Sequence, residues 1–312
     1  MIVNMQEDIL RLQHYEVLDE LLMDKTTGGR ILWATDAYEH LGAEFRRDHT
    51  IDGGSIMWHA EWIMQARVGK AAEEQAQRQK KKAEVFTPLW ICRKMNDYAD
   101  EVWFGREHVF FNGEEPTEGP IQFAAQGPLK QKSWQGYVKS TRLEITCGEA
   151  PFLVSRYDAA TGEVVPIPKR VGLLDRKLRV VNENTETEAD WRKWARVAFE
   201  SVYGYEYQGD SLLIARVNLM QTFIECYLAR WGEVPDRKEI KKIANVIVWN
   251  LWQMDGLTGR VPLAGIQEQQ AGIYQKDQEA LPLCRMKDWR SWRSLRYVDV
   301  NKKHEEGEQL EI

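Results

Sequence analysis

Three short runs of apolar and aromatic residues, each closed by a glycine turn, constrain the fold of this chain most strongly. They are TRLEITC before Gly148, VYGYEY before Gly209 and NVIVWNLWQMD before Gly256. A long apolar stretch with Asp210 or Ser211 as its expected N-cap, SLLIARVNLMQTFIECYLARW, follows the second run. Another helix is expected to begin at VPDRKEIKKIA, before the third run. Strand, helix and strand in this order predict a parallel sheet with crossover helices, and therefore an α/β core.

The turns at the carboxyl ends of these runs carry the candidate chemistry, because open parallel sheets bind ligands there. Glu206 ends the second run, where a carboxylate can accept both hydroxyls of a ribose. Asp255 ends the third run beside a glycine and is suited to accept a hydrogen bond from an adenine amino group. Structural explanations stay open: Gly148 can serve a tight turn, Glu206 a salt bridge, and Asp255 its own Asp-Gly turn.

The rest of the chain divides into a helical N-terminal region and a polar tail. In QEDILRLQHYEVLDELLMD, apolar residues recur every three or four positions, which predicts one amphipathic helix ending at Thr-Thr-Gly-Gly. A second helix is predicted through WHAEWIMQARVGKAAEEQAQRQKKKAEVF, and residues 105–130, with four glycines and three prolines, are predicted to form a loop. We therefore expect a helical region over 1–82, an α/β core over 83–300 with an insertion at about 155–200, and a tail over 301–312.

Composition limits the class of protein. No apolar run approaches the roughly 20 residues of a membrane helix. The N-terminal MIVNMQEDILRLQ has acids where a signal peptide has basic residues, so a soluble, cytoplasmic protein is expected. The six histidines show no metal-ligand spacing, and no metal site is expected. The cysteines are far apart and are expected to be reduced: Cys92, Cys147, Cys226 and Cys284.

The net charge of −6 confines any contact with DNA to local basic segments. One is the cluster Lys80, Lys81 and Lys82. The other is CRMKDWRSWRSLRYVDV, where Arg290 and Arg293 alternate with tryptophans, a mixture suited to phosphate contact and base stacking. The alternative for the first is a solvated helix face, and for the second an amphipathic element with its tryptophans packed inward.

Four segments match, in the same order, motifs of one family: AEVFTPLWICRKM, LEITCGEAPFLV, VYGYEYQGDSLLIARVNL and WQMDGL. The chain thereby resembles the adenine-N6 DNA methyltransferases of restriction-modification systems. The first segment is similar to the family's Phe-Thr-Pro motif and the second to its Leu-Glu-Pro-Ala-Cys-Gly-Ser-Gly cofactor loop. The third is similar to the strand with the ribose-binding acid and the Leu-Ala-Arg helix after it, and the fourth to the adenine-contacting turn. The matches extend from residue 83 to about 260.

This resemblance implies a Rossmann-like methyltransferase core that binds S-adenosylmethionine and acts on DNA. It assigns to the methionine end of the cofactor the residues Phe86, Thr87 and Pro88 and the loop residues Glu144, Thr146, Cys147 and Gly148. It assigns Glu206 and Tyr207 to the ribose, and Asp255 and Gly256 to the adenine. Cys147 is expected to pack rather than react, because no histidine is near it in the sequence.

The chain departs from the family at three places. The second glycine of the cofactor loop is replaced by Ala150, followed by Pro151, and about 50 residues separate that loop from Glu206. The family's catalytic signature, Asn or Asp followed by Pro-Pro and an aromatic residue, is missing, since none of the ten prolines precedes another. That signature holds the target amino group of a flipped base. No catalytic residue is therefore predicted, and a second polypeptide is expected to supply the motif. The alternatives are a non-catalytic methyltransferase-like module that binds DNA or a partner, and an unrelated α/β nucleotide-binding enzyme.

Overall fold

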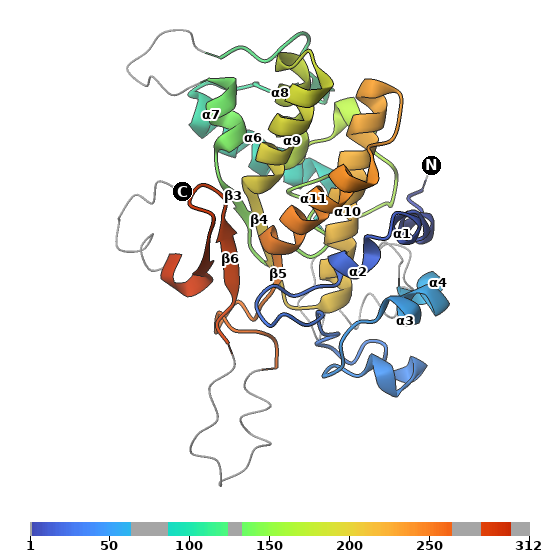
Figure 1. Ribbon diagram of the computed structural model, residues 1–312. Helices are drawn as coiled ribbons and strands as arrows, with labels where there is room; N and C mark the ends of the chain where they lie inside the picture. The colour runs from blue at the N-terminus through green and yellow to red at the C-terminus, as the bar shows by residue number, and fades with distance from the viewer. Residues whose placement is uncertain (1, 64–86, 124–132, 264–281, 301–312) are drawn as a thin grey trace.

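The protein is described by a computed structural model that covers residues 2–63, 87–123, 133–263 and 282–300 (Figure 1). Its centre is a parallel sheet in the order β3-β4-β5, formed by Arg142–Glu144, Val202–Glu206 and Leu251–Gln253. Leu143 pairs with Tyr203, and Tyr205 pairs with Trp252. The three predicted strands are therefore present and parallel, although each is short.

Most of the helices lie on one side of this sheet (Figure 1). Their bounds are α1 Met5–His14, α2 Leu18–Leu21, α3 Gly53–Trp58, α4 Ala60–Ile63, α6 Leu89–Phe104, α7 Trp134–Lys139, α8 Leu173–Asn184, α9 Glu188–Glu200, α10 Gly209–Trp231 and α11 Arg237–Asn250, with 3-10 turns η1 Glu39–Leu41, η2 Ala43–Phe45 and η4 Ile167–Lys169. The insertion expected at about 155–200 contributes α8 and α9, which pack into the main core.

The two faces of the sheet are covered by different elements. Val202 and Leu251 point into the main core beside α9, α10 and α11. On the other face, Tyr203 and Trp252 belong to a second apolar cluster with Met286. Met286 lies on an antiparallel hairpin of β6, Arg285–Asp288, and β7, Arg293–Arg296. A second, smaller hairpin joins β1, Phe111–Asn112, to β2, Glu115–Pro116, inside the segment predicted as a loop.

Two predicted helices and one predicted strand have different bounds in the structure. The single N-terminal helix is wrong, because Glu16 adopts a left-handed conformation with φ of +56° and separates α1 from α2. The predicted strand NVIVWNLWQ is also wrong at its start, because α11 continues to Asn250 and leaves only three residues of strand. The predicted second helix, 58–86, begins in the structure with Trp58 at the end of α3 and with α4, separated at His59, and its remainder, 64–86, lies outside the described residues.

Helix α10 forms the centre of the protein. Its N-cap is Gln208 rather than the predicted Asp210 or Ser211, and Asp210 instead accepts a hydrogen bond from the Tyr38 hydroxyl at 2.9 Å. By length and composition this helix could cross a membrane, but 78% of its apolar window is buried inside the protein. It therefore serves as the central helix of the apolar core.

Candidate functional site

The carboxyl ends of the three parallel strands meet around Glu206. One carboxylate oxygen, Oε2, accepts a hydrogen bond from the Gly148 N–H at 2.8 Å, across the gap between β4 and the loop that follows β3. The other, Oε1, accepts from the N–H groups of Tyr207 and Gln208 at 2.9 and 3.0 Å. The Glu206 carbonyl also accepts from Met254 N–H at 3.0 Å, just before Asp255. The structure thus brings together the three turns that the sequence predicted as the candidate site.

The β3 loop, residues 145–154, has an unusual backbone. Thr146, Gly148 and Ala150 all adopt left-handed conformations, with φ of +48°, +53° and +63°. Such conformations are ordinary for glycine and disfavoured for residues with a Cβ. Ala150 therefore holds a conformation that a glycine would adopt without strain. No atom lies within 4 Å of the place where a Cβ would stand at Gly148, so the backbone is open to a ligand there.

The buried carboxylate of Glu144 anchors the far end of this loop. Its oxygens accept the N–H groups of Phe152 and Leu153 at 3.4 and 3.1 Å, and the side chain is buried beneath the loop. Burial, with a smaller contribution from the nearby charge of Glu206, raises the pKa of Glu144 to about 8. Glu144 is therefore placed to shape the loop, and the cofactor contact predicted for it would be made through the loop backbone.

This raised pKa predicts a pH dependence of stability. Because the pKa of Glu144 is about 8 in the folded protein and near 4.5 when unfolded, the folded state binds more protons between these values. Stability should therefore fall as pH rises from about 5 to 8, with a contribution from Glu144 of about 4 kcal/mol. Urea unfolding at pH 5, 7 and 9 measures this. Glu144→Gln should flatten the dependence, and an equally steep loss in that variant would contradict the assignment.

Asp255 organises the turn after β5. Its Oδ1 accepts the Leu257 N–H at 2.9 Å, and its carbonyl accepts the Gly259 N–H at 2.8 Å. Gly256 lies against Tyr205, where an added Cβ would be 3.0 Å from the ring. Asp255 therefore stabilises its own Asp-Gly turn, as the structural explanation of this residue requires. The Asp255 charge also raises the pKa of the neighbouring Tyr207, after burial as the larger cause, which places the two predicted residues near each other.

The Phe-Thr-Pro segment is described in part. Phe86 lies outside the described residues, Thr87 accepts a hydrogen bond from the Cys92 thiol at 3.8 Å, and Pro88 is the N-cap of α6. Asn96 on α6 donates to the carbonyl of Phe152 at 3.0 Å, so the helix after the motif contacts the β3 loop.

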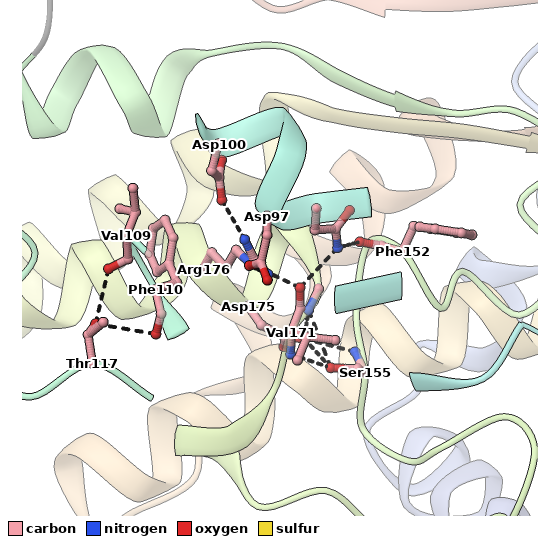
Figure 2. Close-up of polar contacts among 12 residues, drawn as sticks. Asp97, Asp100, Val109, Phe110, Thr117, Phe152, Ser155, Val171, Asp175 and Arg176 are labelled. Atoms are coloured by element: carbon pink, nitrogen blue, oxygen red, sulfur yellow. Dashed lines mark hydrogen bonds and ion pairs between the residues drawn. The ribbon is translucent and has the colours of Figure 1, made fainter. Parts of the chain in front are cut away.

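A polar network, which sequence reasoning missed, fixes α6 and α8 against the end of the β3 loop (Figure 2). The fully buried Arg176 donates to Asp100 at 2.8 Å, to Asp97 at 2.7 Å and to the Val171 carbonyl at 3.0 Å. Asp175 accepts from the backbone N–H of Ser155 at 2.8 Å and from its hydroxyl at 3.2 Å. The residues of this network come from distant parts of the chain, so no local pattern marked them.

Gln253 is a second positioning residue that sequence reasoning missed. Its amide bonds to the N–H and the carbonyl of Leu32, both at 2.8 Å, and donates to the Tyr207 carbonyl at 2.9 Å. It therefore attaches the N-terminal region to the strand ends. The only sequence signal was its place at the end of a predicted strand.

Of the two basic candidate segments, only the β6–β7 hairpin lies within the described residues. Lys80, Lys81 and Lys82 lie outside the described residues. Arg290 and Arg293 are exposed at the turn of the β6–β7 hairpin. Of the two tryptophans there, Trp289 donates to Asn250 at 2.7 Å, whereas Trp292 is two-thirds exposed. The hairpin therefore combines an inward tryptophan with an exposed basic and aromatic turn.

Other chemistry within the described residues would need a metal-binding cluster, a reactive cysteine or a further cavity. No cluster of three His, Cys, Asp or Glu side chains there could hold a metal ion. All four cysteines are free, and burial raises the pKa of Cys147 well above its usual value. A cavity of about 420 Å³ lies between α8 and the β1–β2 hairpin, lined by Phe110, Arg176 and Arg179, and is separate from the strand ends.

Comparison of the chain with protein-family profiles, curated proteins and solved structures finds no match in any of the three. The methyltransferase-like fold and its cofactor therefore stay predictions from the sequence motifs.

Proposed function

We propose that this chain is the S-adenosylmethionine-binding part of a DNA adenine-N6 methyltransferase, with a Rossmann-like core. The observation that carries the proposal is the hydrogen bond from Gly148 N–H to Glu206 Oε2, at 2.8 Å. It joins two motifs that are 58 positions apart in the chain at the carboxyl edge of one parallel sheet. Ligands of open parallel sheets bind at such an edge.

The residues at this edge fit the polar parts of the cofactor. A carboxylate offers about four lone pairs, and the hydrogen bonds from Gly148, Tyr207 and Gln208 use three of those on Glu206. The remaining lone pair of Oε2 can accept one ribose hydroxyl. The open space beside Gly148 suits the methionine part, and Asp255 suits the adenine amino group. When bound, S-adenosylmethionine supplies an electrophilic methyl group that an amine can attack.

The target amine is held elsewhere in this proposal. Because the chain has no Pro-Pro pair, a second polypeptide supplies the Asn/Asp-Pro-Pro-aromatic motif. The hairpin turn with Arg290, Arg293 and Trp292 contributes to DNA contact. Restriction-modification systems act on DNA inside the cell, so we place the protein in the cytoplasm.

The proposal predicts that methyl transfer requires both this chain and a second polypeptide. With radiolabelled S-adenosylmethionine and mixed-sequence DNA, the isolated chain should transfer methyl groups only at background level. Addition of a polypeptide that carries the missing motif should produce N6-methyladenine, identified by mass spectrometry of the digested DNA. Formation of 5-methylcytosine, or no transfer by a mixture that binds both cofactor and DNA, would overturn the assignment.

A non-catalytic module is the second candidate, and one observation favours it. Glu206 is only 7% exposed, and its bonds to three backbone N–H groups also serve a purely structural purpose. In that case DNA or a partner would bind, while S-adenosylmethionine would not. Cofactor binding therefore separates the two candidates.

A further inference from the structure

The outer edge of β3 carries no strand within the described chain. In a parallel pair, alternate residues of a strand bond to the same neighbour. Arg142 donates its N–H to Ser201 of the β4 side at 2.9 Å, so the backbone groups of Leu143 point the other way. Among the described strands, β1 pairs with β2 and β6 with β7. An open edge of this kind is a template for a further strand.

The opposite edge of the sheet is protected. On β5, the Gln253 amide bonds to both backbone groups of Leu32. The buried Arg216 donates to the Leu251 carbonyl at 2.7 and 3.0 Å. Of the two edges of the sheet in the described residues, the β3 edge is therefore the one open to a further strand, and β3 also carries the β3 loop of the candidate site.

Exposed apolar side chains lie on both sides of this open edge. Leu143 and Ile145 are exposed on the hairpin face of the sheet, and Ile145 is 62% exposed. Helix α6 lies on the other face, where Asp100 pairs with Arg142 at 3.4 Å. Apolar side chains on both faces suit a strand that brings its own covering elements, as in a βα unit.

The outer face of α6 has the spacing of a helix-packing seam. Cys92, Asn96 and Asp100 are buried against the core. The seam on the outer side consists of Ile91, Met95, Tyr98 and Val102, separated by four, three and four positions. Tyr98 is 69% exposed, and Met95 and Val102 are more than half exposed. This spacing is the one by which a helix packs against another helix.

The exposed area is large enough for a stable complex. Five large apolar side chains of α6 and the β3 region are exposed on this side: Met95, Tyr98, Val102, Leu143 and Ile145. At about 100 Å² of exposed area for each partly exposed side chain, this set offers on the order of 500 Å², and with the open backbone of β3 it approaches the ~800 Å² that each partner buries in a standard interface.

We propose that these five residues and the open β3 edge, together the β3 docking face, bind a second polypeptide that adds a parallel strand with a helix against α6. This inference rests on the proposed function, because it identifies the occupant as the polypeptide with the Asn/Asp-Pro-Pro-aromatic motif. The carboxyl end of the added strand lies beside the β3 loop, which places that motif next to the cofactor site.

Site-specific photocrosslinking in the cells that encode the chain tests the docking face. A benzoylphenylalanine is incorporated into the tagged full chain at the position of Tyr98, of Ile145 or of the exposed control Val234. Tyr98 and Ile145 should link to the same polypeptide, through peptides near an Asn/Asp-Pro-Pro-aromatic motif, and Val234 should not. A link to a second copy of this chain, to a polypeptide without that motif, or to none would overturn the proposal.

A second substitution separates this proposal from the proposed function. Tyr98→Glu should lower the crosslink yield at Ile145 by at least about ten-fold, whereas Val234→Glu should leave it unchanged. Neither variant should alter calorimetric binding of S-adenosylmethionine to the isolated chain. Cofactor binding without the crosslink would overturn the docking face alone, and the crosslink without cofactor binding would overturn the proposed function alone.

Discussion

Replacing Glu206 by alanine should abolish S-adenosylmethionine binding and lower the free energy of unfolding by about 4 kcal/mol. The loss of stability arises because the N–H groups of Gly148, Tyr207 and Gln208 lose their acceptor in a buried place. Each buried N–H left without a partner costs about 1–3 kcal/mol. Calorimetry with the cofactor and urea unfolding measure the two effects. A variant that binds the cofactor with unchanged affinity would contradict the ribose assignment.

A matched pair of substitutions separates binding from stability. Glu206→Gln keeps an oxygen for Tyr207 and Gln208 and should lose about 2 kcal/mol of stability. Asp175→Asn makes the same change in another buried carboxylate, which accepts from Ser155 and Gly172 away from the strand ends. Both variants should lose similar stability, but only Glu206→Gln should lose cofactor affinity. Equal loss of affinity in both would make Glu206 a structural residue.

Arg176→Ala should destabilise the protein by about 5 kcal/mol, since truncating one partner of a buried ion pair leaves charges uncompensated. The side chain is 1% exposed and neutralises Asp97 and Asp100, which also accepts from the Tyr137 hydroxyl at 3.0 Å. The Arg176 guanidinium also lies over the rings of Phe110 and Phe111 (Figure 2 labels Arg176 and Phe110). Chemical unfolding monitored by circular dichroism measures the loss.

An exposed arginine provides the control for this substitution. Arg11 pairs with Glu7 one helical turn away, and both side chains are more than half exposed. Arg11→Ala should therefore change stability by less than about 0.5 kcal/mol. If Arg176→Ala were as mild as Arg11→Ala, the network would not be what fixes α6 and α8 to the end of the β3 loop.

The convergence of the candidate site could be predicted because strand ends carry local signals. Apolar runs closed by glycine or acid marked the ends of β3, β4 and β5, and parallel pairing then required Gly148, Glu206 and Asp255 to lie at one edge. The helix ends were less predictable. The run NVIVWN has β-branched residues suited to a strand, yet tertiary packing continues α11 through it.

Features that depend on distant contacts could not be predicted. Arg176 is 76 positions from Asp100, and Gln253 is 221 positions from Leu32. Charged residues in a single sequence are most often on the surface, so nothing marked Arg176 as buried. Alanine itself gives no sign of the left-handed backbone that Ala150 adopts, and the one signal in the sequence was its alignment with a glycine of the resembled loop.

Titration calorimetry of the isolated chain with S-adenosylmethionine tests the central claim most directly. The account predicts saturable binding of one cofactor per chain, with a dissociation constant below about 1 mM, or more than about 4 kcal/mol of binding free energy. Glu206→Gln should remove this binding, and Asp175→Asn should retain it. No binding to the folded protein at millimolar cofactor would contradict the account and leave the chain as a non-catalytic module.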